Sequence, residues 1–156
     1  PQLIPAHLNL ADLLRASGRD GEARAQLERA RTIAPESGEV LYALGLSAIR
    51  AGDSEQALTY LTGAAERESS GTRHRYVHAV ALHDLGDPRA AVRALRRLNR
   101  DVPGNPEVLL ALANYSAELG MLEAAAGYAG ELAAVDPGNS KWRRLAERFA
   151  AMARGR

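Results

Sequence analysis

Leucine and alanine recur along the chain at spacings of three and four residues, the period of an amphipathic α-helix. Leu41, Leu44 and Ala48, for example, fall on one side of a single predicted helix. Short breaks separate the apolar stripes, and they contain glycine, proline or residues that favour helix ends. The pattern predicts a chain of short helices joined by tight turns.

The breaks are periodic, with a spacing of 34 residues. The glycines that keep this spacing are Gly18, Gly52, Gly86 and Gly120. Alanine follows each of them five residues later, and proline closes three of the four periods, with Ser69 in the remaining place. A fixed period in this range is typical of stacked repeats. We expect four helix–turn–helix units, at about residues 4–37, 38–71, 72–105 and 106–139, in one domain that spans residues 1–156.

Several residues predict where individual helices begin. Asp20 and Thr72 are expected N-caps, because their side-chain oxygens can accept from free backbone N–H groups. Ser37 has the same expected role at the first helix of the second unit. Asp53, with Gln56 three residues later, predicts a capping box at the second helix of that unit. Two further starts combine a capping residue with proline at the first helical position, and they are Asp87-Pro88 and Asn105-Pro106.

The apolar stripes predict which side of each helix is buried. Leu10, Leu13 and Leu14 form the expected inner stripe of the first helix. After the fourth unit, residues 140–153 predict one more helix, with Trp142, Leu145, Phe149 and Met152 on its apolar side and charges on the other. Such a helix suits the end of a repeat stack, which would otherwise expose its stacking surface.

Composition narrows the classes of protein. The chain has no cysteine, so disulfides, thiolate metal sites and a cysteine nucleophile are excluded. No apolar run reaches the roughly 18 residues needed to span a membrane. Arginine outnumbers lysine nineteen to one, which points to a GC-rich bacterial genome and leaves cytoplasm and periplasm equally open.

The net charge of +1 is unevenly distributed. Residues 1–71 carry −3, residues 72–100 carry +5, residues 101–139 carry −6 and residues 140–156 carry +5. This alternation differs from the uniform basic surface of a nucleic-acid-binding domain.

The repeat resembles the tetratricopeptide repeat (TPR) over about residues 4–139. That family places leucine at position 7, glycine or alanine at 8, alanine at 20 and proline near 32. Here position 8 is occupied in repeat order by Ala11, Gly45, Ala79 and Ala113. The departures are His78 at position 7 and the absence of an aromatic residue at position 11. The resemblance implies an all-α fold, an α-solenoid of four hairpins and a C-terminal capping helix, wound as a right-handed superhelix.

The resemblance also implies a non-enzymatic scaffold that binds a protein or peptide in a concave groove lined by the first helix of each unit. No cofactor or metal is implied. The expected partner-binding residues lie on those four first helices, and they are Asn9, Asp12, Tyr42, Leu46, Ile49, Arg50, Arg73, Tyr76, Val80, His83, Leu110 and Asn114. In this interpretation the two tyrosines form an aromatic floor, and Arg50 and Arg73 hold an acidic group.

A structural interpretation of the same tyrosines stays open, because stacked repeats also need residues that fill the space between first helices. The pattern with which some TPR domains hold the C-terminal carboxylate of heat-shock chaperones is absent, since Arg73 alone matches it. A fainter similarity, around residues 9–13, 42–46 and 75–82, links the chain to TPR segments that follow bacterial multihaem cytochrome c domains; no haem attachment motif is present.

Other patterns offer alternatives. An arginine stripe on one second helix could meet nucleic acid, an anionic surface or an acidic protein, and it consists of Arg89, Arg93, Arg96, Arg97 and Arg100. Because no aromatic residues are interleaved with the arginines, the alternative interpretation, a solvated convex face balanced by the acidic zones, is favoured over such binding. His74 and His78 have a metal-compatible spacing, but no carboxylate is placed as a third ligand. Self-association through the uncapped first repeat stays open as well.

Overall fold

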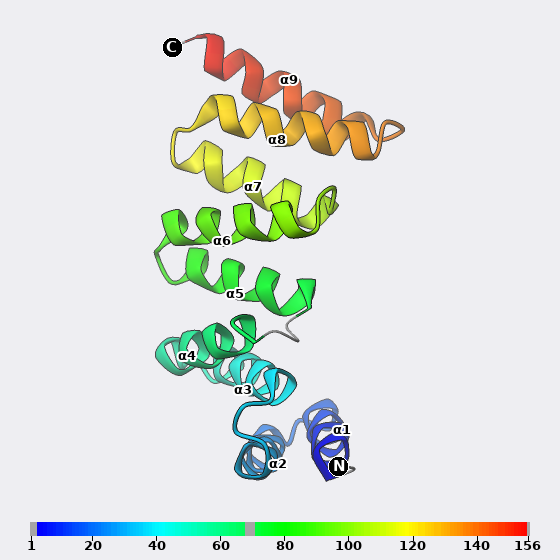
Figure 1. The fold of residues 1–156 in the computed structure, drawn as a ribbon, viewed down its shortest axis with the longest axis vertical. Helices are drawn as coiled ribbons and strands as arrows, with labels where there is room; N and C mark the ends of the chain where they lie inside the picture. The colour runs from blue at the N-terminus through cyan, green and yellow to red at the C-terminus, as the bar shows by residue number, and fades with distance from the viewer. Residues whose placement is uncertain (1–2, 68–70, 156) are drawn as a thin grey trace. The chain divides into compact units, whose positions relative to one another are not determined.

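The computed structural model describes residues 3–67 and 71–155, and every regular element in these two ranges is an α-helix (Figure 1). The helices are α1 (Leu3–Ala16), α2 (Asp20–Ile33), α3 (Gly38–Arg50), α4 (Ser54–Ala65), α5 (Thr72–Asp84), α6 (Pro88–Asp101), α7 (Pro106–Glu118), α8 (Leu122–Val135) and α9 (Ser140–Arg154). The all-α prediction is confirmed. Ser69, which replaces the periodic proline, lies outside the described residues.

The chain divides into two compact units. The first, Pro1–Ala81, contains α1 to α4 and most of α5. The second, Leu82–Arg156, contains the end of α5 and α6 to α9. Each unit has its own buried core, and the features discussed below each belong to one unit.

The periodic glycines form the same turn four times. All four have positive φ, between 72° and 93°, a conformation in which a residue without a Cβ is favoured. In each turn the residue that follows the glycine donates its backbone N–H to the carbonyl of the residue five positions before that donor. The four bonds are Arg19 to Leu14, Asp53 to Ala48, Asp87 to Leu82 and Met121 to Ser116, with N···O distances of 2.9–3.0 Å. This is the Schellman motif, and it explains why glycine keeps the period.

The second helices begin as predicted in two of the units. Asp53 accepts a hydrogen bond from the backbone N–H of Gln56 at 3.1 Å, and Asp87 accepts one from Ala90 at 2.8 Å. The Gln56 side chain donates to the Asp53 carboxylate at 2.6 Å, whereas a full capping box would direct it to the Asp53 backbone. The prediction for Asp20 is wrong. The 34-residue register places the cap at Arg19, so Asp20 becomes the first helical residue, where its charge still favours the helix dipole.

The cap predictions for the first helices are also correct in some units and wrong in another. Ser37 accepts from the Val40 backbone at 3.4 Å, and Asn105 caps α7 through the N–H groups of Glu107 and Val108. Thr72 is not an N-cap: it is the first residue of α5, and the carbonyl of Gly71 before it accepts the backbone N–H groups of His74 and Arg75. One residue of shift moves the threonine hydroxyl away from the capping position.

The core of the first unit contains mostly alanine and leucine. Its buried cluster comprises Ala11, Leu14, Ala23, Leu27, Ala30, Val40 and Leu44. The small residues predicted at positions 8 and 20 are therefore at the contact between paired helices. Gly45 shows how close that contact is, because a Cβ built there would lie 2.7 Å from Leu61 Cγ.

The predicted inner stripe of α1 is partly wrong. Leu14 is buried, but Leu10 is 42% exposed and Leu13 is 67% exposed. Leu44, which holds the position of Leu10 in the next repeat, is buried because α2 packs against α3 and covers it. No helix precedes α1 among the described residues, so its corresponding face is uncovered.

In the second unit the stripes of α6, α7 and α8 are buried as predicted, and α9 packs on α8. Phe149 is buried against Ala113, Ala125 and Ala129. Met152 was expected beside it, but it is 48% exposed. The register of α9 accounts for this, since Phe149 belongs to the cluster on α8 and Met152 does not.

Candidate functional site

A cleft of about 470 Å³ opens in the first unit, between the first helices of its repeats. Its lining residues come from α1, α2, α3 and α5, and they are Leu8, Ala11, Asp12, Arg15, Ala23, Leu27, Glu39, Tyr42, Ala43, Leu46, Arg50 and Arg73. The volume lies within the roughly 300–1,000 Å³ that is common for ligand sites. It is the obvious candidate for a binding site in this unit.

The floor of the cleft is apolar. Ala11, Ala23 and Leu27 belong to the buried core, and Leu8 and Ala43 pack against that core from its edge. Alanine side chains leave space where a larger residue would fill the hollow. The floor can therefore bury an apolar side chain of a partner without rearrangement of the core.

One side of the cleft is held by contacts between α3 and α5. The Nε of Arg73 donates a hydrogen bond to the hydroxyl of Tyr42 at 3.1 Å. The ring of Tyr42 stacks on that of His74, with centroids 4.4 Å apart and an angle of 27° between the planes. Burial lowers the pKa of His74 despite the opposing attraction of Glu39. The stack therefore presents a neutral imidazole to the tyrosine near pH 7.

The rim of the cleft carries charges of both signs. Arg15 lies 3.6 Å from Asp12 on the same helix, and Arg50 lies 3.8 Å from Asp20 on α2. Both pairs are largely exposed, and exposed ion pairs contribute at most about 1 kcal/mol. A ligand carboxylate can therefore replace Asp20 as the partner of Arg50 at small cost.

The structure brings five of the twelve predicted site residues to this cleft, namely Asp12, Tyr42, Leu46, Arg50 and Arg73. Asn9 and Ile49 are exposed on α1 and α3 but do not line it, and Tyr76 and Val80 are half-buried on α5. The other three, His83, Leu110 and Asn114, belong to the second unit. Tyr42 both packs on the neighbouring first helix and lines the cleft, so the two interpretations of this residue are compatible.

The floor residues Ala11, Ala23 and Leu27 were missed as site residues because their periodicity assigns them to the core. The alanines themselves could have indicated the cleft, because several small residues on facing helices leave unfilled volume wherever no large side chain packs between them. Periodicity alone does not show which of those positions remain open.

His83 forms a separate polar cluster in the second unit. Its ring stacks on Tyr115 with centroids 3.7 Å apart and an angle of 7° between the planes. Its Nε2 lies 2.6 Å from Glu118 Oε2, and its Nδ1 lies 3.1 Å from Asp84 Oδ1. The hydrogen bond to Glu118 is the main cause that raises the pKa of His83. Two carboxylates thus favour the protonated ring.

His74 and His78, whose spacing is compatible with a metal site, make structural contacts instead. The Nε2 of His78 lies 3.1 Å from the Thr62 hydroxyl on α4, and His74 stacks on Tyr42. Burial lowers the pKa of His78. Among the described residues, no three histidines, aspartates or glutamates are grouped as metal ligands. Within the same residues, no helix combines the length and apolar character needed to cross a membrane.

Solved structures with this fold share little sequence with the chain. YrrB, described as a TPR protein with an unusual peptide-binding site, is 20% identical with a TM-score of 0.79, over 96% of this chain and 77% of its own. MamA from Desulfovibrio magneticus RS-1 is 16% identical with a TM-score of 0.80, over 98% and 86%. PilF from Pseudomonas aeruginosa is 17% identical with a TM-score of 0.79, over 99% and 70%. These similarities confirm an α-solenoid of helical repeats.

A search of curated protein sequences finds no match. Three family models, each described as tetratricopeptide repeat, match residues 4–47, 42–87 and 82–149 and together extend over nearly the whole chain. Proteins built from this repeat are generally scaffolds for protein–protein interaction, which is the role that the resemblance implies. This chain belongs to the tetratricopeptide repeat family.

Proposed function

We propose that the chain binds a peptide, or a segment of a partner protein, in the cleft of its first unit. The observation that carries this proposal is an apolar, alanine-lined floor formed by α1, α2 and α3, with rim arginines that come from the three successive first helices α1, α3 and α5. Such a surface favours a segment that places a large apolar side chain next to a carboxylate.

Each part of the cleft has its own role in this proposal. Leu46 and the floor bury the apolar side chain, which contributes about 1.5–3 kcal/mol when burial is complete. Arg50 and Arg73 meet the carboxylate, and Tyr42 positions Arg73 through its hydroxyl. Asp12 and Glu39 on the same rim disfavour partners with long acidic runs, so the preferred ligand carries one or two negative charges.

The experiment starts from a random peptide display library, selected on the complete chain. The selected peptides are then measured by calorimetry against Leu46→Asp and Arg73→Glu. We expect each substitution to weaken binding at least tenfold. Leu85→Asp is the matched control, because Leu85 is similarly apolar, 40% exposed and in the second unit. If the selected peptides share an apolar and an acidic residue but bind both cleft variants as tightly as the wild type, the cleft is not the binding site.

We also propose a second candidate function, self-association through α1. The observation that favours it is a row of exposed apolar residues with heptad spacing on that helix, namely Leu3, Ala6, Leu10 and Leu13. The neighbouring exposed residues Asn9, Ala16 and Ser17 are uncharged, so two copies of this face can meet without repulsion. In the second repeat the position that corresponds to Leu10 is Leu44, which is buried because α2 packs against α3.

Analytical ultracentrifugation over a concentration series tests self-association. We expect the average mass of the wild type to rise with concentration and that of Leu10→Glu/Leu13→Glu to stay at the monomer value. A concentration-independent monomer for the wild type would refute this second function and leave the cleft proposal untouched.

A further inference from the structure

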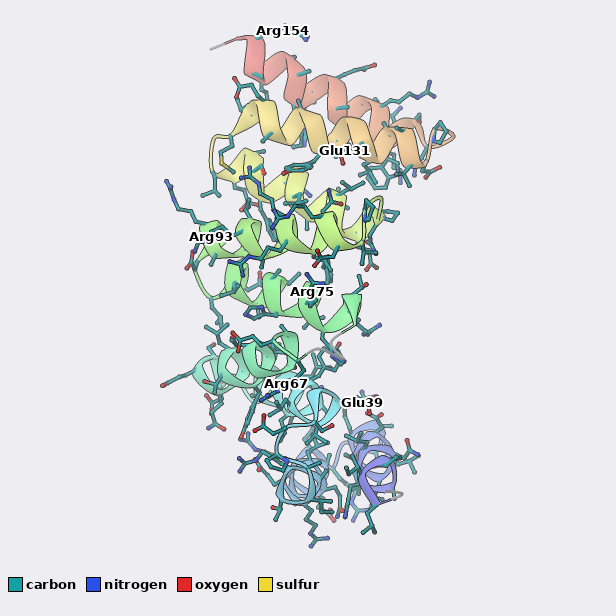
Figure 2. The ribbon with its side chains drawn as sticks, in the orientation of Figure 1. Glu39, Arg67, Arg75, Arg93, Glu131 and Arg154 are labelled. Carbon is teal, nitrogen blue, oxygen red and sulfur yellow. The ribbon has the colours of Figure 1, made fainter. Side chains whose placement is uncertain are left out.

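Five arginines gather along α6 in the second unit, on a surface distinct from the cleft. Arg89, Arg93, Arg97 and Arg100 are exposed at spacings of four, four and three residues, while Ala91, Leu95 and Leu98 on the opposite side are fully buried. Arg93 is labelled on this helix in Figure 2. The arrangement is a strongly amphipathic helix with one cationic side.

Part of this cationic side borders a small hollow. A pocket of about 210 Å³ is lined by Arg89, Val92, Arg93, Arg96, Leu119 and Met121. Leu119 and Met121 come from the turn between α7 and α8, and Val92 is almost completely buried in α6. The hollow is below the roughly 300–1,000 Å³ of small-molecule sites, so it suits a single side chain presented by a larger partner.

The charged side chains that line the pocket are all cationic. It holds three guanidinium groups and, among the described residues that form it, no carboxylate. Arg96 is fixed by a hydrogen bond from its Nε to the Tyr128 hydroxyl at 3.1 Å, which occupies one of its five N–H groups. A guanidinium binds a carboxylate through two parallel hydrogen bonds, and this makes arginine well suited to acidic side chains.

We infer that this pocket is a second docking site, which receives an acidic segment of a partner protein that carries a large apolar residue next to its carboxylates. The apolar residue enters between Val92, Leu119 and Met121, and the carboxylates contact Arg89 and Arg93. The site lies in a different unit from the cleft and does not depend on the function proposed for it.

Two observations favour a protein segment over nucleic acid or an anionic membrane. No aromatic ring lines the pocket, so it offers no platform for the stacking of bases. The residues that follow α6 in the same unit, 102–139, carry five acidic and no basic side chains. Leu119 and Met121 belong to that acidic stretch, which repels a long polyanion more strongly than a short acidic segment.

A differential selection tests the inference. A random peptide display library is selected on the complete wild-type chain, after removal of peptides that also bind Arg89→Glu/Arg93→Glu. We expect the remaining peptides to combine acidic residues with a large apolar residue. Their affinity should fall at least tenfold for Arg93→Glu, and also when their apolar residue is replaced by serine.

Arg97→Glu is the matched control, because Arg97 is an exposed arginine on α6 that does not line the pocket. It should reduce affinity less than threefold, and Leu46→Asp in the cleft should leave it unchanged. Equal losses for Arg97→Glu and Arg93→Glu would mean diffuse electrostatic attraction and overturn the inference. Tighter binding of polyuridylate or of phosphatidylglycerol vesicles than of any selected peptide, dependent on the same arginines, would also overturn it.

Discussion

The contact between α3 and α4 makes a strong prediction about Gly45, which occupies the small position of the second repeat. An added Cβ would lie 2.7 Å from both Cγ and Cδ2 of Leu61, distances that real Cβ atoms do not show. Leu61 is completely buried, and Cγ is its branch point, so the side chain cannot simply swing its end aside. Gly45→Ala must therefore move the two helices apart or force Leu61 into another rotamer.

The expected magnitude follows from two opposing effects. Overpacking of a buried contact costs about 1–3 kcal/mol. Alanine gains about 1 kcal/mol over glycine in a helix. We expect a net loss of up to about 2 kcal/mol in the free energy of unfolding. Alanine stands at the same position in the other three repeats, so the result reports how closely α3 and α4 approach.

Urea unfolding monitored by circular dichroism measures the effect. Two glycines serve as controls, because a Cβ at Gly21 of α2 or Gly130 of α8 would meet no atom within 4 Å. Gly130→Ala should stabilise its helix by about 0.5–1 kcal/mol, and Gly21→Ala should be neutral or slightly stabilising. If Gly45→Ala is as stable as these controls, the proposed close contact is wrong.

Three further predictions concern the second unit and the helix starts. Because the pKa of His83 is raised, its hydrogen bonds stabilise the fold fully below the unfolded pKa of about 6.5, and this contribution is lost as pH rises through the folded pKa. NMR titration should show a lower His83 pKa in Glu118→Gln than in the wild type. An unchanged pKa would contradict the conclusion that Glu118 is the main cause of the shift. Asp87→Ala should cost about 1 kcal/mol in urea unfolding, whereas Asp20→Ala should cost less because Asp20 makes no capping bond. Phe149→Ala should cost about 3–5 kcal/mol by the same assay, and a loss below about 1 kcal/mol would show that α9 does not cover the cluster on α8.

The helices and their turns could be predicted almost completely from the sequence, because their causes are local. The glycine period specifies the Schellman turns, and Asp53, Asp87 and Asn105 cap their helices as expected. The prediction for Asp20 failed because capping depends on a single position, and the register that makes Asp53 and Asp87 N-caps assigns Arg19 to that position.

Burial was harder to predict where it depends on a neighbouring helix. Leu10 and Leu13 carry the same helical signal as Leu44, yet they are exposed because no described helix packs on that side of α1. Met152 differs from Phe149 for a related reason, since α8 covers one and not the other. Amphipathic periodicity identifies an apolar face but does not show whether another element covers it.

The candidate site was predictable only in part. The register correctly placed Tyr42 and Arg73 on neighbouring first helices, and the structure joins them by a hydrogen bond. The hollow itself depends on Ala11 and Ala23, whose small size opens volume only where facing helices leave a gap. Such a gap is a property of the packed unit and is not encoded at any one position.

The most direct test of the central claim is NMR mapping of a selected peptide on the isotopically labelled chain. We predict that saturating peptide shifts the backbone amides of Leu46, Arg50 and Arg73, and that the shifts disappear with Leu46→Asp. Peptide-dependent shifts confined to residues 82–156, with the amides of those three residues unchanged, would contradict the claim that the cleft of the first unit is the binding site.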